Sequence, residues 1–262
     1  MWTGGNTRTR AGTPVYIDET VRCRLTVPYD GILFHMGYRR VPFQRDEWFH
    51  CYSRGIDKRI VFESEKDAER FLQLLYLANS TGPVRLDDLS NKTEDIVTHH
   101  RPATIVSIGA YCFMPNHYHL LLKEIVDGGI SLFMQKLGTA YSMYFNAKNK
   151  RIGNVFVKPF RSRHVGEDRY FQHVVNYIHC NPVEMFEPGW KKGVVRDLRR
   201  LEHRLRQYRY SSFPDYAGER RAIATILSKD GFDVFNNTSP KKMLADAKTY
   251  YSSAAIDDVD FS

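Results

Sequence analysis

Apolar positions recur along the chain with periods that change between two and about three and a half, which predicts alternating strands and helices. The string WFHCYSR predicts a strand over 48–54, and Ser64 then caps a helix whose stripe includes Phe71, Leu74 and Leu75. The same patterns predict two strands over 104–113 and 117–123 joined by a turn, a helix over 131–145, a strand over 154–162 and a helix over 168–181. This order is typical of an α+β, ferredoxin-like (split βαβ) fold, an antiparallel sheet with helices on one face.

The segments around this core divide the chain further. Residues 1–40 show no sustained periodicity and are expected to be an N-terminal extension, residues 41–183 form the α+β domain, and residues 184–262 are a basic, helical C-terminal region. Its predicted helices lie over 191–209, near 220–228 and from Ser239–Pro240 onward, followed by a frayed acidic tail over 254–262. The polar stretch 81–101 is expected to be an inserted loop.

The composition is that of an ordinary globular protein, with 262 residues, 42% hydrophobic residues and a formal net charge of +8. No apolar run approaches the roughly 20 residues that cross a bilayer, and the first residues lack the apolar stretch of a secretory signal. We therefore expect no membrane partner and a cytoplasmic, nucleoid-associated location. Four widely spaced cysteines indicate neither a zinc clip nor a disulfide framework, so we expect reduced thiols.

The positive charge is concentrated in two segments. Residues 146–163 hold six basic residues and no acidic one, interleaved with Phe156 and Phe160, a pattern that suits single-stranded nucleic acid. The six candidate DNA-binding residues are Lys148, Lys150, Arg151, Lys158, Arg161 and Arg163. Residues 191–209 hold eight basic residues against two acidic ones, but Leu201 and Leu205 recur there at helical spacing. A helix with a solvated face and a DNA-contacting helix are equally good interpretations of that second segment.

Two pairs of residues could carry chemistry together. His117 and His119 are two apart on a strand and point to the same face, so their imidazoles could chelate one cation, although core or surface histidines would give the same pattern. Tyr177 and Asn181 are four apart on the flank of a helical apolar stripe. If both pairs meet at one sheet edge, two imidazoles and an amide oxygen would surround Mg²⁺ or Mn²⁺ beside a tyrosine. Taken singly, each residue is better explained without a site, Tyr177 as a half-buried tyrosine and Asn181 as a helix C-cap.

The motifs that contain these residues resemble those of a known family. YCFMPNHYHLLLK, over 111–123, and YIHCNPV, over 177–183, are similar to the signature and nucleophile motifs of the single-tyrosine HUH transposases, namely the REP-associated tyrosine transposases and their insertion-sequence relatives. Further matches follow in the family's order at 49–62, 134–146, 153–162 and 208–216. The resemblance also implies a ferredoxin-like fold and makes 41–183 the HUH catalytic domain.

By this resemblance, His117 and His119 are metal ligands, Tyr177 is the nucleophile, and Asn181 is the third ligand, where related enzymes often have Gln. It implies a transposase that uses Mg²⁺ or Mn²⁺ to cleave and rejoin single-stranded or hairpin DNA, palindromic repeats included, through a 5′-phosphotyrosine, as a monomer or homodimer. Two other functions fit the residues: a non-catalytic hairpin-DNA-binding protein, and a metal-dependent phosphodiesterase that uses water as the nucleophile.

Overall fold

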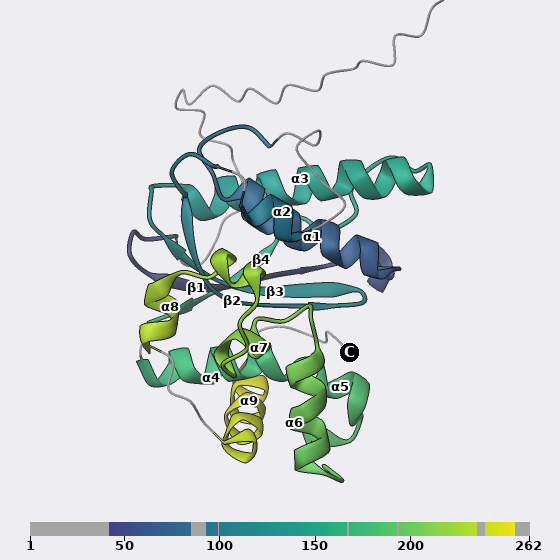
Figure 1. Ribbon diagram of the computed structural model, residues 1–262, viewed down its shortest axis with the longest axis vertical. Coiled ribbons are helices and arrows are strands. Elements are labelled where there is room, and N and C mark those ends of the chain that lie inside the picture. The colour runs from purple at the N-terminus through teal and green to yellow at the C-terminus, as the bar shows by residue number, and fades with distance from the viewer. Residues whose placement is uncertain are drawn as a thin grey trace, which may run out of the picture.

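An antiparallel sheet forms the centre of the computed structural model, which describes residues 42–84, 93–98, 100–166, 168–192, 194–234 and 239–254 (Figure 1). The expected extension over 1–40 and almost all of the acidic tail lie outside the described residues. The sheet has four strands in the order β2-β3-β1-β4: β1 (Trp48–Arg54), β2 (Val106–Met114), β3 (His117–Glu124) and β4 (Arg161–Val165). The predicted α+β class and the split βαβ order of its elements are confirmed.

Two long helices cover one face of the sheet. They are α1 (Glu65–Ala78) and α3 (Gly129–Asn149), and they pack on each other and on the sheet through a large apolar core. Ser64 is the N-cap of α1 as predicted, and its backbone N–H donates to Asp67 Oδ2 at 2.9 Å. Alternate residues of β3, namely Tyr118, Leu120 and Leu122, point into this core.

The opposite face is covered by α4 (Asp168–Cys180), as Figure 1 shows. The predicted apolar stripe of α4 packs on alternate residues of the strands; this second core contains Ala110, Cys112, Met114, Leu121, Val165, Phe171, Val174, Val175 and Ile178. Helices therefore cover both faces, and the expectation of helices on one face is corrected in this detail. The stripe on α4 needs a sheet surface of its own, because the first face is already filled by α1 and α3.

Most of the described C-terminal helices add to the layer on the α4 side, whereas Ile226 and Leu227, just before α8 (Lys229–Val234), are buried in the core with α1 and α3. The region also contains α5 (Val183–Phe186), α6 (Leu198–Gln207), α7 (Phe213–Tyr216) and α9 (Pro240–Ala254). The predicted start of the last helix is confirmed, and α9 packs along α4 while α8 packs on β2. In α6, Leu201 and Leu205 are buried and Asp197 is the N-cap. None of the described helices combines the length and apolar character that a membrane-spanning segment needs.

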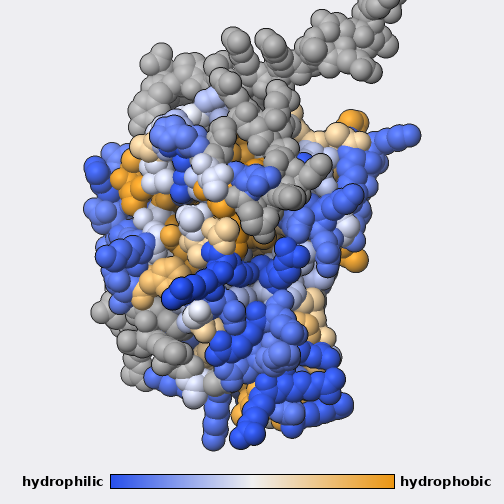
Figure 2. Space-filling view, viewed as in Figure 1, coloured by the Kyte–Doolittle hydropathy of each residue, from blue (hydrophilic) through white to orange (hydrophobic). Residues whose placement is uncertain are grey.

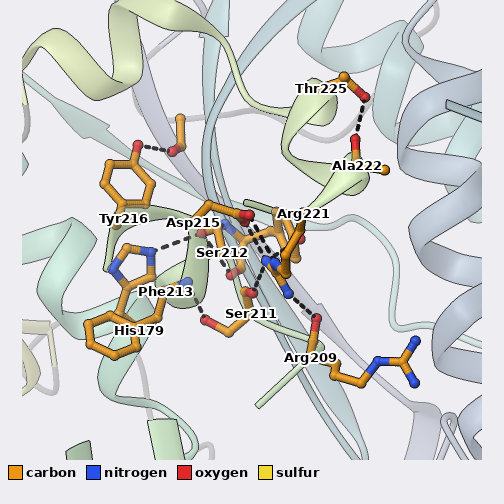
Figure 3. A network of polar contacts seen from close by, with 12 residues as sticks. His179, Arg209, Ser211, Ser212, Phe213, Asp215, Tyr216, Arg221, Ala222 and Thr225 are labelled. Atoms are coloured by element: carbon orange, nitrogen blue, oxygen red, sulfur yellow. Dashed lines mark hydrogen bonds and ion pairs between the residues drawn. The ribbon is translucent and has the colours of Figure 1, made fainter. Parts of the chain in front are cut away.

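A polar network attaches the segment between α6 and α8 to the edge strand β2 (Figure 3). The Arg221 guanidinium forms an ion pair with Asp215 and donates to the carbonyls of Ser211 and Arg209 at 2.8 and 3.0 Å. The Ser212 backbone N–H donates to the carbonyl of Tyr111 on β2 at 2.9 Å. This part of the C-terminal region is therefore fixed directly to the sheet.

Four local predictions differ from the structure, the first being the helix predicted over 191–209, which is reduced to α6 with a separate 3-10 helix over Trp190–Lys192. The polar segment 81–101 contains a short helix, α2 (Thr93–Val97), whose Ile96 and Val97 are buried in the core, so it is not simply a loop. The strand predicted over 154–162 lies at Arg161–Val165 instead, since Pro159 has no N–H for a strand ladder. The helix predicted near 220–228 is a 3-10 helix over Ala222–Ile226. Cys51, Cys112 and Cys180 are free buried thiols, as expected, and Cys23 lies outside the described residues.

Candidate active site

His117 and His119 lie at the start of β3, on the face that α4 covers. Residues directly opposite on antiparallel strands share a face, and the register places Met114 opposite His117 and Cys112 opposite His119, both in the core beneath α4. The two imidazole rings are edge to face with centroids 5.1 Å apart. Strand alternation therefore presents both rings to one site, as the sequence predicts.

The C-terminal end of α4 brings Tyr177 and Asn181 to the same place. The Tyr177 ring is half-buried and packs edge to face on His119, with centroids 5.3 Å apart. The Asn181 side chain hydrogen-bonds to His117. The structure thus brings together the four residues singled out as ligands and nucleophile.

Asn181 has two roles in this arrangement. Its Nδ2 donates to the Tyr177 carbonyl at 3.0 Å, which satisfies one of the carbonyls exposed at the end of α4. Its side chain also bonds to His117. The C-cap interpretation and the site interpretation therefore hold together, because the capping bond fixes the amide beside the imidazole.

Burial keeps both histidines neutral. Desolvation lowers the pKa of His117 to about 4, against an opposite effect of the bond to Asn181 and with small further lowering by the cations Lys191 and Arg54. Desolvation also lowers the pKa of His119 well below its usual range. At neutral pH each ring therefore has one nitrogen with a lone pair, which is the form that binds metal ions.

Hydrogen bonds determine which nitrogen of each ring can coordinate a metal ion. His117 Nδ1 is 2.6 Å from Asn116 Oδ1, and His119 Nδ1 is 2.9 Å from His50 Nε2. Both Nδ1 atoms are engaged, so Nε2 is the nitrogen through which each ring would bind a cation. Two such imidazoles and an amide oxygen are a donor set that suits Mn²⁺ or Mg²⁺ with water or phosphate oxygens in the remaining positions. Among the residues that the structure describes, no group of three or more His, Cys, Asp or Glu forms an alternative metal centre.

The structure adds residues to this site that the sequence analysis did not select. His50 and Tyr52 lie on β1, and the Tyr52 ring is 5.6 Å from that of His119. Burial is the largest influence on Tyr52 and raises its pKa to about 12, so its hydroxyl remains protonated. Arg54 is paired with His117 across the β1–β3 ladder. Alternation in WFHCYSR shows that 50, 52 and 54 share a face, but only the register shows that this face is the one with His117 and His119.

The first basic segment separates into different environments. Arg161 and Arg163 of β4 lie opposite Tyr52 and His50, next to the site, and Lys150, Arg151 and Lys158 are in the connection before β4. Lys148 instead forms ion pairs with Asp67 at 2.7 Å and Glu63 at 3.3 Å. Its charge is thus largely compensated within the protein.

The two aromatic residues of that segment serve the core. Phe156 is buried among the aromatic rings on the α1–α3 face, and Phe160 packs against the same core and stacks on Phe43 with centroids 6.1 Å apart. The expectation that they supply flat faces for unstacked bases is therefore wrong for Phe156. Phe160 is already stacked within the protein.

The second basic segment also brings a cation close to the site. Hydrophilic side chains cover the surface over α6 in Figure 2, and Arg199, Arg200 and His203 of α6 are exposed. Lys191, in the 3-10 helix Trp190–Lys192, pairs with Glu184 at 3.1 Å and contributes to the lowered pKa values of both site histidines. This segment is therefore both a helix with a solvated face and a source of positive charge beside the site.

A match to a family model agrees with the motifs. Residues 72–181 match the model of the family described as IS200-like transposase, a segment that runs from within α1 to Asn181 and includes His117, His119 and Tyr177. The resemblance to the single-tyrosine transposases is confirmed over this segment. A solved structure described as a REP-associated tyrosine transposase bound to a REP hairpin matches with 16% identity and a TM-score of 0.42, covering 78% of this chain and 95% of the other. No curated protein matches the sequence.

Proposed function

We propose that this protein is a DNA transposase that cleaves and rejoins single-stranded or hairpin DNA through a 5′-phosphotyrosine at Tyr177. The observation that carries the proposal is the convergence of His117, His119, Tyr177 and Asn181, all within the segment that matches the IS200-like transposases. In this proposal residues 41–183 are the catalytic domain, and the basic region over 184–262 contributes to DNA binding.

His117, His119 and Asn181 are the proposed ligands of a divalent cation, Mg²⁺ or Mn²⁺. When bound, such an ion polarises a phosphoryl oxygen and stabilises negative charge in the transition state. The neutral imidazoles supply nitrogen ligands, and the Asn181 amide, fixed by its bond to the Tyr177 carbonyl, supplies an oxygen. Lys191 and Arg54 add positive charge for the phosphate.

The covalent step uses Tyr177. Its phenol loses a proton to solvent, and the oxygen attacks the scissile phosphorus while the bond from phosphorus to the 3′ oxygen breaks. The leaving 3′ oxygen takes up a proton to become a free 3′-OH, and the 5′ side of the DNA stays attached to Tyr177. A phenol with an ordinary pKa near 10 is both a usable nucleophile and a tolerable leaving group, so a second 3′-OH can reverse the step and join new strands.

DNA is proposed to follow the cations around the site. Arg161 and Arg163 lie on β4 and Lys191 acts on the site histidines, with Lys150, Arg151 and Lys158 further along the first basic segment. Hairpin DNA, palindromic repeats included, is the proposed substrate because the motifs resemble those of the REP-associated tyrosine transposases.

The proposal is tested by incubating labelled single-stranded hairpin DNA with the protein and Mg²⁺ or Mn²⁺ and separating covalent adducts on a denaturing gel. We expect an adduct with the wild type and none with Tyr177→Phe. Tyr170→Phe is the matched control, since Tyr170 lies two turns earlier on α4 with its ring against Arg163, and it should keep the adduct.

Each alternative has its own outcome in this assay. An adduct that persists in Tyr177→Phe would overturn the assignment of the nucleophile. Cleavage without any adduct would instead indicate a phosphodiesterase that uses water. Binding of the hairpin without cleavage would indicate a non-catalytic DNA-binding protein.

A further inference from the structure

His50 is the buried neighbour of the candidate ligand His119. It lies on β1 on the α4 side of the sheet and is only 2% exposed. Its Nε2 is 2.9 Å from His119 Nδ1, and the two rings stack with centroids 5.0 Å apart and planes 25° apart. The His50 ring also packs edge to face on Tyr177, with centroids 5.7 Å apart. One side chain therefore contacts both a candidate ligand and the candidate nucleophile.

Only one proton fits between the two nitrogen atoms. If His119 Nδ1 carries it, His50 Nε2 accepts the hydrogen bond and His119 Nε2 keeps its lone pair. If His50 Nε2 carries it, the neutral His119 ring must hold its own proton on Nε2, and that nitrogen cannot bind a cation. The direction of this hydrogen bond thus determines whether His119 can be a ligand through Nε2.

We propose that His50 is a positioning residue that accepts the Nδ1–H of His119 and so holds the Nε2 lone pair of His119 toward the site. This inference rests on the proposed function for the role of the metal ion, but the hydrogen bond and the tautomer are properties of the protein alone. A metal-binding histidine commonly donates its second ring N–H to a partner that fixes its tautomer and orientation.

The partner of the other candidate ligand has the same arrangement. His117 Nδ1 lies 2.6 Å from Asn116 Oδ1, an oxygen that only accepts, so Nδ1 of His117 is the donor of this hydrogen bond. With His50 as acceptor, His119 likewise donates from Nδ1. In both candidate ligands, Nδ1 is bonded to an acceptor and Nε2 is the nitrogen that points toward the site.

The surroundings of His50 favour a neutral acceptor. The His50 ring is buried, and its pairing partner on β4 is the cation Arg163, which disfavours a second positive charge there. A neutral imidazole has one nitrogen that accepts a hydrogen bond. The Tyr52 ring, 4.9 Å from that of His50, packs on it and limits its rotation.

The tautomer can be measured on the wild-type protein in the presence of a chelator. Two-bond ¹H–¹⁵N correlation spectra of protein with ¹⁵N-labelled histidine distinguish protonated from unprotonated ring nitrogens. We expect His119 to carry its proton on Nδ1 and His50 to have an unprotonated Nε2 at pH 7.5. An unprotonated His119 Nδ1 facing a protonated His50 Nε2 would overturn the proposal without any need for a variant to fold.

Variants test the consequence for metal binding without relying on activity. We expect His50→Phe, which keeps a ring but removes the acceptor, to weaken Mn²⁺ binding about 10- to 100-fold in calorimetric titration. His50→Gln, whose amide oxygen can take the place of Nε2, should retain most of the affinity. Cys51→Ala is the control, because Cys51 neighbours His50 on β1 but faces the α1–α3 core, and it should bind Mn²⁺ like the wild type.

The results separate this inference from the proposed function. Wild-type Mn²⁺ affinity in His50→Phe, or an equal loss in Cys51→Ala, would overturn the positioning role. Absence of a DNA adduct with the wild-type protein would instead overturn the proposed transposase function and leave the measured tautomer standing.

Discussion

The two faces of the sheet differ in what the same strands present to them. Toward α1 and α3 the strands present a continuous apolar core that includes Phe49, Leu120 and Leu122. Toward α4 they present apolar residues such as Leu121 under the helix, but imidazoles at His117 and His119 near its C-terminal end. Because side chains alternate along each strand, the neighbours Leu120 and His119 belong to opposite faces.

Because of this difference, alternate residues of one strand contribute either to the stability of the fold or to the candidate site. The α1–α3 face is filled by apolar side chains, so substitutions there are expected to act on folding. At the end of α4 the apolar stripe stops, and a half-buried tyrosine, an amide and neutral imidazoles take its place. Substitutions there are expected to act on metal binding and DNA cleavage.

The largest expected effect is on the apolar face. Leu120 is fully buried, so Leu120→Ala should lower the free energy of unfolding by about 2–5 kcal/mol through lost burial and a residual cavity. Urea denaturation measures this loss. The rate of adduct formation per folded molecule should stay unchanged, and a variant of full stability that forms no adduct would contradict the separation of the two faces.

His119→Phe tests the other face of the sheet, the one that α4 covers. It keeps a ring in place but removes a candidate ligand, and since a catalytic metal ion contributes several kcal/mol to transition-state stabilisation, single-turnover adduct formation should fall by at least about a hundred-fold. Its loss of stability, measured in chelator, should be smaller than that of Leu120→Ala. Adduct formation at the wild-type rate would exclude His119 as a ligand.

The buried histidines on the α4 side predict how stability changes with pH. Burial lowers the pKa of His50 and His179 to about 3 and that of His117 to about 4. In the unfolded chain these groups bind protons near pH 6.5, so below that pH the unfolded state holds more protons and folding becomes less favourable. Stability is therefore fully present above about pH 6.5 and is lost as the pH falls toward 4, by about 1.4 kcal/mol per pH unit for each histidine.

Urea denaturation at pH 7.5 and 5 in chelator measures this slope. His179→Gln, which can still bond to Ser212, should be less sensitive to pH than the wild type by the contribution of one histidine. An identical slope in the two proteins would show that His179 does not titrate in this window.

The smallest effects distinguish two basic residues of one segment. Lys148 neutralises the fully buried carboxylate of Asp67, so Lys148→Ala should cost about 1 kcal/mol of stability and leave the salt dependence of hairpin binding unchanged. Arg161→Ala should leave stability unchanged and reduce the slope of log Kd against log salt by about 1, as expected for one lost phosphate contact. Fluorescence anisotropy over a salt series measures both, and the reverse pattern would contradict the division of the segment.

Much of the fold and part of the site could be predicted from local patterns. Alternation places His117 and His119 on one face, and helical spacing places Tyr177 and Asn181 on one flank of α4, because both relations depend only on the period of the element. The βαββαβ order likewise follows from the periodicity of each segment. The period of the strand and the period of the helix do not show that the two pairs meet. The resemblance of the motifs to a known family does.

Other features depended on partners that are distant in sequence. The aromatic residue Phe156 and the cation Lys148 stand in a segment that resembles a nucleic-acid contact, yet one belongs to the core and the other pairs with Asp67, 81 residues away. Local composition cannot distinguish these cases, because burial and ion pairing are set by what lies across the interface. The second face of the sheet was missed for the same reason, since an apolar stripe does not specify which surface covers it.

The sequence by itself determined the order of the strands and helices of the α+β domain and the residues whose chemistry suits metal binding or attack on a phosphate, because these follow from short periods and from side-chain chemistry. The tertiary structure alone decided that α4 covers the face opposite α1 and α3, and that β1 lies beside β3 in a register that brings His50 to His119. His50 and His119 are 69 residues apart in the sequence. They meet only because β1 pairs with β3 in one register, and a shift of one residue would turn the side chains to the other face. No pattern within either strand shows this contact.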